Sequence, residues 1–457
     1  MAALSERKIE IVRTLVEAAP DKVVGNLQMA LAETSEDSAL GSVRRLVESE
    51  VDERRLRNTV LQPIAPMCAG DGRDERALTF PARVLALLWR GLRATAPEEV
   101  EEARETFETY DPEESSEESF DQLVRIAAYA VRSREHAGFR EAAELADAAR
   151  PNGAELLASC LDLAPVVRRA SRRIPEWLAS FSEGSAAAAR LAYKDAVAIA
   201  EDAGPRFFEM LAAQMAHPWM VLRIISEVMD KPNERYLADS EMAGFGERLL
   251  EDIDNALKSI AKFDLDGGPE AARRAGKLVE VITLQIAELE TYIDLSRDHG
   301  WGHRISKQKA SLASVVEGRL RDAEKHVKLA LPTEPARLRR IRRAIPRLTL
   351  PPDPRTTARA VALLHFTQEI RSSANYGGFS AARLKMLEAV GEHLDSYVDE
   401  AVDLLKTGDA EDEHVAEAFL EVAADLSLLV RGEKAADLVR RRTAAATHPD
   451  LPFAADG

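Results

Sequence analysis

The densest group of side chains that could do chemistry lies in the segment Arg297-Asp298-His299-Gly300-Trp301-Gly302-His303-Arg304. Two imidazoles and a carboxylate are ligands that zinc or iron accepts, and a histidine can act as a general base near neutral pH. Asp298, His299 and His303 are therefore the candidate catalytic residues of a metal-dependent or phosphate-handling hydrolase. Arg297 and Arg304 would bind the phosphate.

The same segment also fits a plain turn between two helices. Gly300 would end the first helix, Trp301 would pack back on that helix, and both histidines would face solvent. His299 and His303 share a helical face only if the helix persists through two glycines, which weaken helices. We favour the turn over the metal site.

The spacing from Arg297-Asp298 to His303 resembles the Arg-polar-x₄–₆-His signature of the all-α HEPN nucleases, which implies cleavage of nucleic acid. The resemblance covers seven residues. The loose Arg-x₄–₆-His spacing recurs elsewhere in this arginine-rich chain, namely from Arg319 and Arg321 to His326, from Arg359 to His365, and from Arg441 to His448. The spacing alone therefore does not indicate a nuclease.

Two aromatic segments are candidate binding sites. Tyr376 and Phe379 flank two glycines in a predicted loop, where glycines permit close backbone approach to a ligand. Trp219 lies between a segment rich in methionine and phenylalanine and a segment rich in methionine, isoleucine and valine, and the two could line an adaptable apolar groove. For both segments the alternative, which we favour, is ordinary core and hairpin packing.

Opposite charges are concentrated in two blocks. Twelve carboxylates and one arginine lie between Glu98 and Asp121, whereas residues 331–354 contain six prolines and six arginines. We expect the second block to be a basic linker around a short helix at 335–344. Arg337, Arg340 and Arg343 are candidate binding residues for an acidic partner, which could be the first block of the same chain.

Composition excludes several classes of function. The net charge of −17 disfavours binding to nucleic acid or an anionic membrane, unless the 337–347 block overrides it. The sequence has no Walker A loop, dinucleotide fingerprint, HExxH pair or Gly-x-Ser-x-Gly elbow, so we expect no cofactor. Cys68 and Cys160 lack the spacing of a zinc site and should be small buried residues. We expect no signal peptide, no membrane span and a cytoplasmic location.

The elements that position these residues are predicted to be helices throughout. Apolar residues recur at intervals of three and four, most clearly over 272–297, and strand-like alternation is almost absent. We therefore predict an all-α, multi-helix array of antiparallel hairpins, as an irregular bundle or solenoid. The expected regions are 1–97, an acidic segment 98–120, a central domain 121–331, the basic linker 332–355, a C-terminal bundle 356–446 and a disordered tail 447–457.

The missing catalytic motifs and the helical pattern together favour a non-catalytic function. We expect a scaffold or adaptor that binds another protein through apolar grooves and charged blocks. The alternatives are the hydrolase at 297–304 and binding of nucleic acid or an anionic surface through 337–347.

Overall fold

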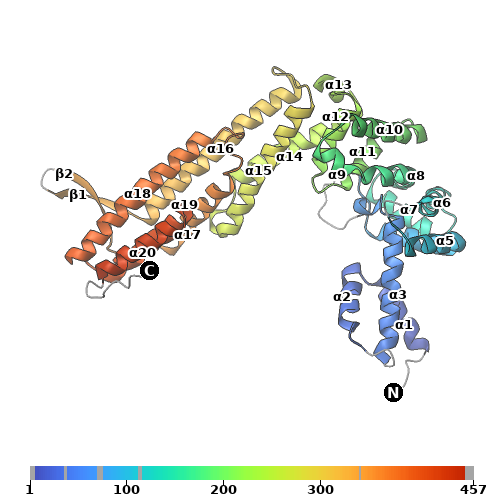
Figure 1. The fold of residues 1–457 in the computed structure, drawn as a ribbon, viewed down its shortest axis with the longest axis horizontal. Coiled ribbons are helices and arrows are strands. Elements are labelled where there is room, and N and C mark those ends of the chain that lie inside the picture. Colours follow the sequence, from blue (N-terminus) through green and yellow to red (C-terminus); the bar gives the residue numbers. More distant parts are fainter. Residues whose placement is uncertain (1–5, 35–38, 69–75, 112–115, 339–340, 448–457) are drawn as a thin grey trace. The chain divides into compact units, whose positions relative to one another are not determined.

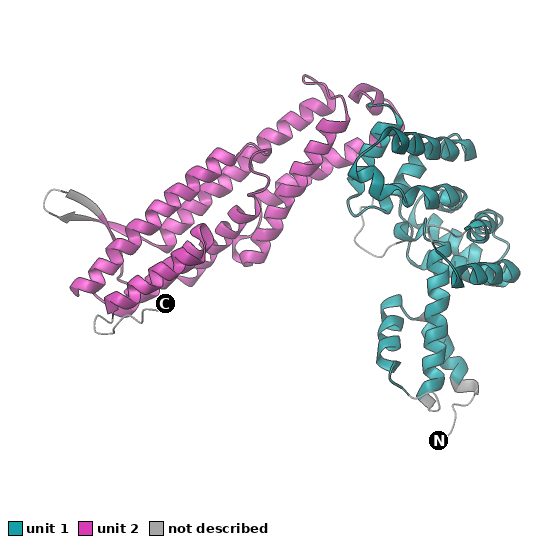
Figure 2. Ribbon diagram, viewed as in Figure 1, with its two compact units in different colours: residues 1–231 teal, residues 232–457 magenta. Residues whose placement is uncertain are grey.

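The structure is a computed structural model that describes residues 6–34, 39–68, 76–111, 116–338 and 341–447, without the side chains of residues 6–8, 18, 39, 336–338 and 341–343. It confirms the all-α prediction, because most of the described chain is helical and its two strands form a single hairpin (Figure 1). The chain divides into two compact units, unit 1 (Met1–Lys231) and unit 2 (Pro232–Gly457), shown in Figure 2. The expected boundaries near 97 and 120 fall inside unit 1, and those near 331 and 355 inside unit 2.

Unit 1 is built from helices and short 3₁₀ turns. Its elements are α1 (Glu6–Ala18), α2 (Asp21–Leu31), α3 (Ala39–Val60), η1 (Ala65–Met67), α4 (Arg83–Thr95), α5 (Pro97–Glu108), α6 (Glu118–Ser133), α7 (Ala137–Ala149), α8 (Gly153–Ser171), α9 (Ile174–Ala179), α10 (Glu183–Ile199), α11 (Ala203–Ala213), η2 (Pro218–Met220) and α12 (Val221–Val228). The main core lies around α6 and α8, where Phe120, Leu161 and Val167 are fully buried. Both cysteines are buried, as predicted.

The first three helices form a small subassembly of their own. Valines 16, 24 and 47, one from each helix, make its buried core. Arg54 of α3 fixes the end of α1, because its guanidinium donates to the carbonyl oxygens of Val16 at 3.0 Å and Ala19 at 2.9 Å. The same group contacts Asp21 of α2 at 2.6 Å. One buried arginine therefore joins all three helices and satisfies carbonyl groups that a helix end leaves unpaired.

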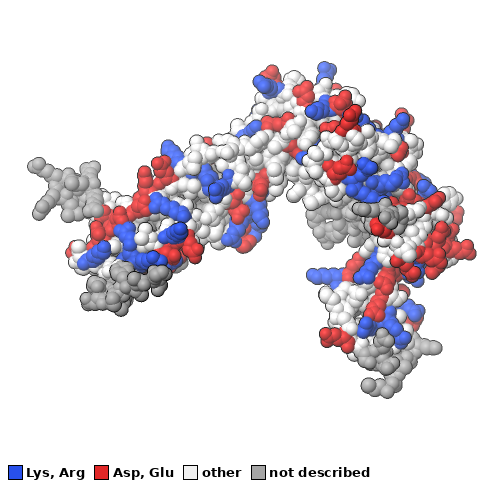
Figure 3. Space-filling view, in the orientation of Figure 1, with Lys and Arg blue, Asp and Glu red and all other residues white. Residues whose placement is uncertain are grey.

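The acidic block of the sequence begins as helix α5. Figure 3 shows Asp and Glu side chains gathered over this part of unit 1. Glu98, Glu101, Glu102, Glu105 and Glu108 are exposed on α5, and Val100 and Ala103 turn into the core. Arg104 neutralises part of this charge by contacting Glu53 of α3 at 2.6 Å. The acidic residues are thus largely the solvated face of an amphipathic helix.

Unit 2 contains the longest helices. Its elements are α13 (Glu234–Ala238), α14 (Ala243–Ala261), η3 (Leu265–Gly267), α15 (Gly268–Tyr292), α16 (Gly300–Ala330), β1 (Thr333–Leu338), β2 (Ile341–Pro346), α17 (Pro354–Glu369), α18 (Ser380–Thr407), α19 (Glu413–Arg431) and α20 (Glu433–Thr447). α17 packs between α15, α16 and α19. No helix in the described ranges combines the length and the apolar content that a bilayer crossing requires.

The expected short helix at 335–344 is wrong. The backbone forms an antiparallel hairpin in which β1 pairs with β2, with Thr333 opposite Pro346 and Leu338 opposite Ile341. The two isoleucines of β2, Ile341 and Ile345, favour a strand, and pairing with β1 decides for it. Arg340 lies outside the described residues, as do the side chains of Arg337 and Arg343. Their role in binding stays a prediction, as does disorder of the tail at 448–457, which also lies outside.

Candidate functional site

The chemistry-bearing segment 297–304 is the start of α16, and a buried carboxylate from another helix holds it. Glu234 of α13 is 5% exposed. Its carboxylate accepts hydrogen bonds from the main-chain N–H groups of Trp301 at 2.6 Å, Gly302 at 3.1 Å and Ser296 at 2.9 Å. A helix N-terminus presents unpaired donors and partial positive charge, so a carboxylate here is strongly favoured. The segment is a helix cap.

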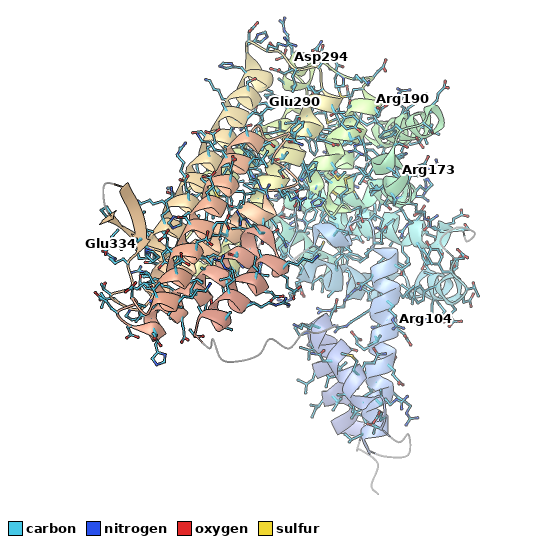
Figure 4. All side chains as sticks on the ribbon, turned by 60° about the vertical axis from the view of Figure 1, so that its left-hand side comes forward. Arg104, Arg173, Arg190, Glu290, Asp294 and Glu334 are labelled. Atoms are coloured by element: carbon cyan, nitrogen blue, oxygen red, sulfur yellow. The ribbon has the colours of Figure 1, made fainter. Side chains whose placement is uncertain are left out.

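Main-chain contacts place α13 where Glu234 can reach that cap. The N–H of Glu234 donates at 2.9 Å to the carbonyl oxygen of Asp294, which follows the end of α15 in the chain and is labelled in Figure 4. Asn233 begins α13 by accepting from the N–H of Tyr236 at 2.8 Å. A short capped helix therefore delivers the carboxylate.

The two glycines of the segment make room for this arrangement. Gly300 has a positive φ of 61°, and a Cβ there would lie 1.7 Å from Oε1 of Glu234. A Cβ on Gly302 would lie 1.9 Å from the carbonyl oxygen of Ser296. The expectation that Gly300 ends the preceding helix is corrected, because α15 ends at Tyr292 and Gly300 begins α16. Glycine at both positions allows the backbone to approach these two oxygen atoms closely.

The remaining polar groups of the segment tie α16 to α14. Trp301 is 4% exposed and donates through Nε1 to Glu247. Arg304 contacts Glu247 at 3.1 Å and Asp254 at 2.7 Å, and Gln308 also donates to Asp254 at 2.8 Å. Burial raises the pKa of Asp254, but the hydrogen bonds from Gln308 and Arg304 outweigh burial and hold it below its usual value. Arg304 is thus occupied in an interhelical network.

The candidate catalytic residues do not converge. Asp298, His299 and His303 are exposed, and Nδ1 of His299 lies 3.0 Å from the hydroxyl of Ser296. The described residues hold no group of three or more His, Cys, Asp or Glu side chains that could bind a metal ion. A metal-dependent hydrolase at this turn needs a third ligand beside the two histidines, and the geometry supplies a helix cap instead.

The loop around Tyr376 connects α17 and α18 and is pinned to α15 and α16. The hydroxyl of Tyr376 donates to Glu290, labelled in Figure 4, and Lys309 donates to the same carboxylate at 3.0 Å. Burial and Glu290 raise the pKa of Tyr376 above its usual value. Phe379 is fully buried, and Gly377 packs against its ring. Tyr376 is the partly exposed member of the pair, and ligand binding by either stays a prediction.

Trp219 and its neighbours lie in unit 1. Trp219 is half-buried in η2 beside exposed His217, with ring centroids 5.6 Å apart. Phe207 and Phe208 of α11 and Ile225 of α12 are buried in the core of the unit. These apolar segments therefore fill the interior, and Trp219 stays a predicted contact residue at its edge.

Sequence reasoning missed a polar groove in unit 1, which we call the helix-end groove. It has a volume of about 590 Å³ and is lined by Asn58, Thr59, Gln62, Tyr110, Glu117, Arg168, Ser171, Arg172, Ile174, Pro175 and Gln214. These residues come from the ends of α3, α8 and α11, the start of α9 and the segment between α5 and α6. No sequence spacing connects elements so far apart in the chain.

The floor of the helix-end groove is a buried arginine. Arg168 is 4% exposed and donates to the carbonyl oxygens of Thr59 at 2.8 Å and Val60 at 2.7 Å, and to Asp121 at 3.2 Å. Burial lowers the pKa of Arg168, and the nearby carboxylate of Asp121 acts in the opposite direction. The guanidinium of Arg168 compensates the partial negative charge at the C-terminal end of α3. Since Asp121 pairs with the same guanidinium, the charges on the floor of the groove balance.

One wall of the groove carries a second set of polar side chains whose charges balance one another. The hydroxyl of Tyr110 donates to Glu117 at 2.6 Å, and Arg172 donates to both groups. Burial, together with Glu117, raises the pKa of Tyr110. The groove therefore offers fixed polar groups whose charges are balanced.

Sequence reasoning also missed a set of exposed apolar side chains near the N-terminus, which we call the N-terminal apolar residues. They are Ile11, Leu15, Val23, Leu27, Met29 and Leu40, with exposed fractions between 37% and 71%. The available signal was the spacing of four between Ile11 and Leu15 on α1 and between Val23 and Leu27 on α2. Each pair lies beside the valine that its helix buries in the small core.

Comparison with protein-family models, with curated proteins and with solved structures finds no match to this chain.

Proposed function

We propose that this protein is a non-catalytic helical scaffold or adaptor that binds another protein through its N-terminal apolar residues. One observation carries the proposal. Among the described residues, seventeen large apolar side chains are exposed, and six of them lie between residues 11 and 40. Single exposed apolar residues are ordinary on a protein surface, but a concentration of them marks an interaction site.

The packing of this subassembly supports the same conclusion. Among the described residues its core buries three valines, 16, 24 and 47, with five partly buried residues packed against them: Val12, Ala19, Leu31, Val43 and Val51. Burying one Leu, Ile or Val side chain stabilises a protein by about 1.5–3 kcal/mol. Covering the N-terminal apolar residues would therefore add apolar burial to a subassembly whose own core is small. A partner that packs on these helices would gain it on binding.

The geometry favours an amphipathic helix of the partner. Ile11 and Leu15 are one turn apart on α1, and Val23 and Leu27 are one turn apart on α2. Helical partners present their own apolar side chains at the same interval. Glu10 and Arg13, which contact one another at 3.2 Å, provide a polar edge beside the first pair.

The test is capture of partners by the full chain from a lysate of its native host, with chemical crosslinking through Lys22 and mass spectrometry. One protein should crosslink to α2 in the wild type. The double variants Ile11→Gln/Leu15→Gln and Val23→Gln/Leu27→Gln should each lose it. The matched control is Leu191→Gln/Leu384→Gln, which changes two leucines that are 58% and 61% exposed in other parts of the chain.

Circular dichroism should show the same helix content in all variants, because every substituted side chain is exposed. Capture that survives both N-terminal double variants would overturn the proposal. So would loss of the partner in the control, since this would indicate nonspecific adhesion to any exposed leucine.

A further inference from the structure

The connection between the two compact units contains two consecutive residues with a left-handed backbone. Unit 1 ends at Lys231, and unit 2 begins at Pro232. The φ angles of Asp230 and Lys231 are 57° and 53°. Positive φ has a steric cost for any residue with a β-carbon, so such residues adopt it rarely and mostly one at a time. Backbone strain therefore lies at the position where the chain passes from one unit to the other.

The end of α12 accounts for the positive φ of Asp230. The N–H of Lys231 donates to the carbonyl oxygen of Ser226 at 2.8 Å, which is the bond of a Schellman cap. This cap needs a left-handed residue directly after the C-cap residue, and aspartate tolerates that conformation better than most residues. Arg190, labelled in Figure 4, also donates to the carbonyl oxygen of Glu227 at 3.1 Å. The chain is thus fixed within unit 1 up to the N–H of Lys231.

The chain is fixed within unit 2 from Pro232 onward. Pro232 is buried, and its carbonyl oxygen accepts from the N–H of Asp294 at 3.4 Å. Asn233 pairs with Asp294 in a parallel bridge, and the N–H of Glu234 donates to the carbonyl oxygen of Asp294 at 2.9 Å. Main-chain contacts therefore hold the first three residues of unit 2 beside the segment that follows α15.

Neither set of contacts requires the positive φ of Lys231, whose side chain is exposed. The direction of its N–H is set by Asp230, and lysine has no special tolerance of this conformation. A proline also favours an extended residue before it, so Pro232 adds to the strain. Because the main chain on each side is fixed within its own unit, the φ of Lys231 changes when one unit turns relative to the other. Rotation to an extended conformation would remove the strain and keep the hydrogen bonds of both sides.

We propose that Lys231 is a hinge between the two units. In one orientation of the units its φ is positive, and in a second orientation Lys231 is extended and unstrained. Hinges are formed by a few residues at the ends of elements that absorb a change in backbone angles, and backbone strain is typical of such switching segments. The hinge involves none of the N-terminal apolar residues, so it can succeed or fail independently of the function proposed above.

The test measures the distance between the two units in single molecules of the full chain by fluorescence energy transfer. The dyes are attached to cysteines introduced by Gln122→Cys in unit 1 and Asp409→Cys in unit 2, at two exposed positions. The native cysteines Cys68 and Cys160 are buried, so the introduced ones react first. The chain with Lys231 should show two populations of transfer efficiency, one for each orientation.

Two substitutions at the hinge should shift these populations in opposite directions. Lys231→Gly removes the steric cost of positive φ, so the ratio of the strained orientation to the extended one should rise about fivefold or more. Lys231→Val should abolish the same population, because a β-branched residue is an outlier at positive φ. The matched controls are Arg134→Gly and Arg134→Val, since Arg134 has a φ of 55° at the end of α6 inside unit 1. Both controls should leave the two populations unchanged.

Hydrogen exchange separates a hinge from local unfolding. The amide at position 231 should stay protected in Lys231→Val, because its bond to the carbonyl oxygen of Ser226 does not depend on the φ of residue 231. Loss of that protection would overturn the proposal, since the substitution would then have opened the cap of α12. So would identical distance distributions for the wild type, Lys231→Gly and Lys231→Val, or an equal shift in the Arg134 variants.

Discussion

The carboxylate of Glu234 and the main-chain N–H of Trp301 are 2.6 Å apart, although the two residues are separated by 67 positions in the sequence. This contact explains the glycines and the tryptophan of the segment 297–304 as parts of a helix start. It also leaves the two histidines of that segment at the surface, outside any cluster of ligands in the described part of the chain.

The first prediction concerns this cap. Glu234→Ala should lower the free energy of unfolding of unit 2 by about 2–3 kcal/mol, because it leaves main-chain donors at the start of α16 without a partner. Glu234→Gln should cost less, since its amide oxygen still accepts. Urea unfolding followed by tryptophan fluorescence measures both. The control Glu241→Gln, at an exposed position, should unfold like the wild type; equal stability of Glu234→Ala and the wild type would contradict the role of the cap.

The second prediction compares two glycines of α14. A Cβ on Gly246 would lie 2.4 Å from the ring of Trp301, whereas a Cβ on Gly244 would meet nothing within 4 Å. Gly246→Ala should therefore destabilise the protein by about 1–3 kcal/mol through overpacking. Gly244→Ala should stabilise it by about 0.5–1 kcal/mol through helix propensity. Chemical denaturation should give changes of opposite sign, and the same sign for both would exclude the packing of Trp301 on α14.

The third prediction concerns pH. Burial lowers the pKa of His393, although its hydrogen bond to the carbonyl oxygen of Leu331 at 3.0 Å and the carboxylate of Glu324 act the other way; Lys328 lowers it further. Burial and Arg273 likewise lower the pKa of His365. These two histidines therefore bind protons more readily in the unfolded chain than in the folded one. The free energy of unfolding should be highest above about pH 6.5 and should decrease as the pH falls below that value.

Melting temperatures between pH 7.5 and 5.5 test this dependence. His393→Gln should show a smaller decrease on acidification than the wild type, because glutamine does not titrate. His414→Gln is the control, since the side chain of His414 is 95% exposed. Identical pH profiles for the wild type and His393→Gln would refute the contribution of His393.

The fourth prediction concerns a buried hydroxyl. The side chain of Tyr397 is almost wholly buried beside Phe419, and its hydroxyl has no hydrogen-bond partner among the described residues. Tyr397→Phe should leave stability unchanged or raise it by about 1 kcal/mol, because it removes an unpaired polar group. Tyr376→Phe should instead destabilise the protein, since it breaks the hydrogen bond to Glu290. A clear loss of stability in Tyr397→Phe would indicate a partner for its hydroxyl.

The sequence predicted local structure well where the residue pattern within a single segment is sufficient. The stripe predicted over 272–297 corresponds to α15 at Gly268–Tyr292, and the burial expected for Cys68 and Cys160 is confirmed. The prediction for the basic block was wrong. A short helix was expected around the arginines, whereas the segment forms a pair of strands. Local composition there contained both signals, and pairing with a second strand decided between them.

The sequence by itself determined that this chain is helical, which faces of its helices are apolar, and that it lacks the common catalytic motifs. Only the tertiary structure decided what the polar residues do. From the sequence, Glu234 is an ordinary acidic residue of a short helix and Arg168 an ordinary arginine of a helical segment; their partners, at the start of α16 and the end of α3, are remote in the chain. Periodicity reports which side of one helix is buried. Which distant side chain contacts that helix depends on the packing of the whole unit. Helix caps and grooves are formed by such contacts between remote segments.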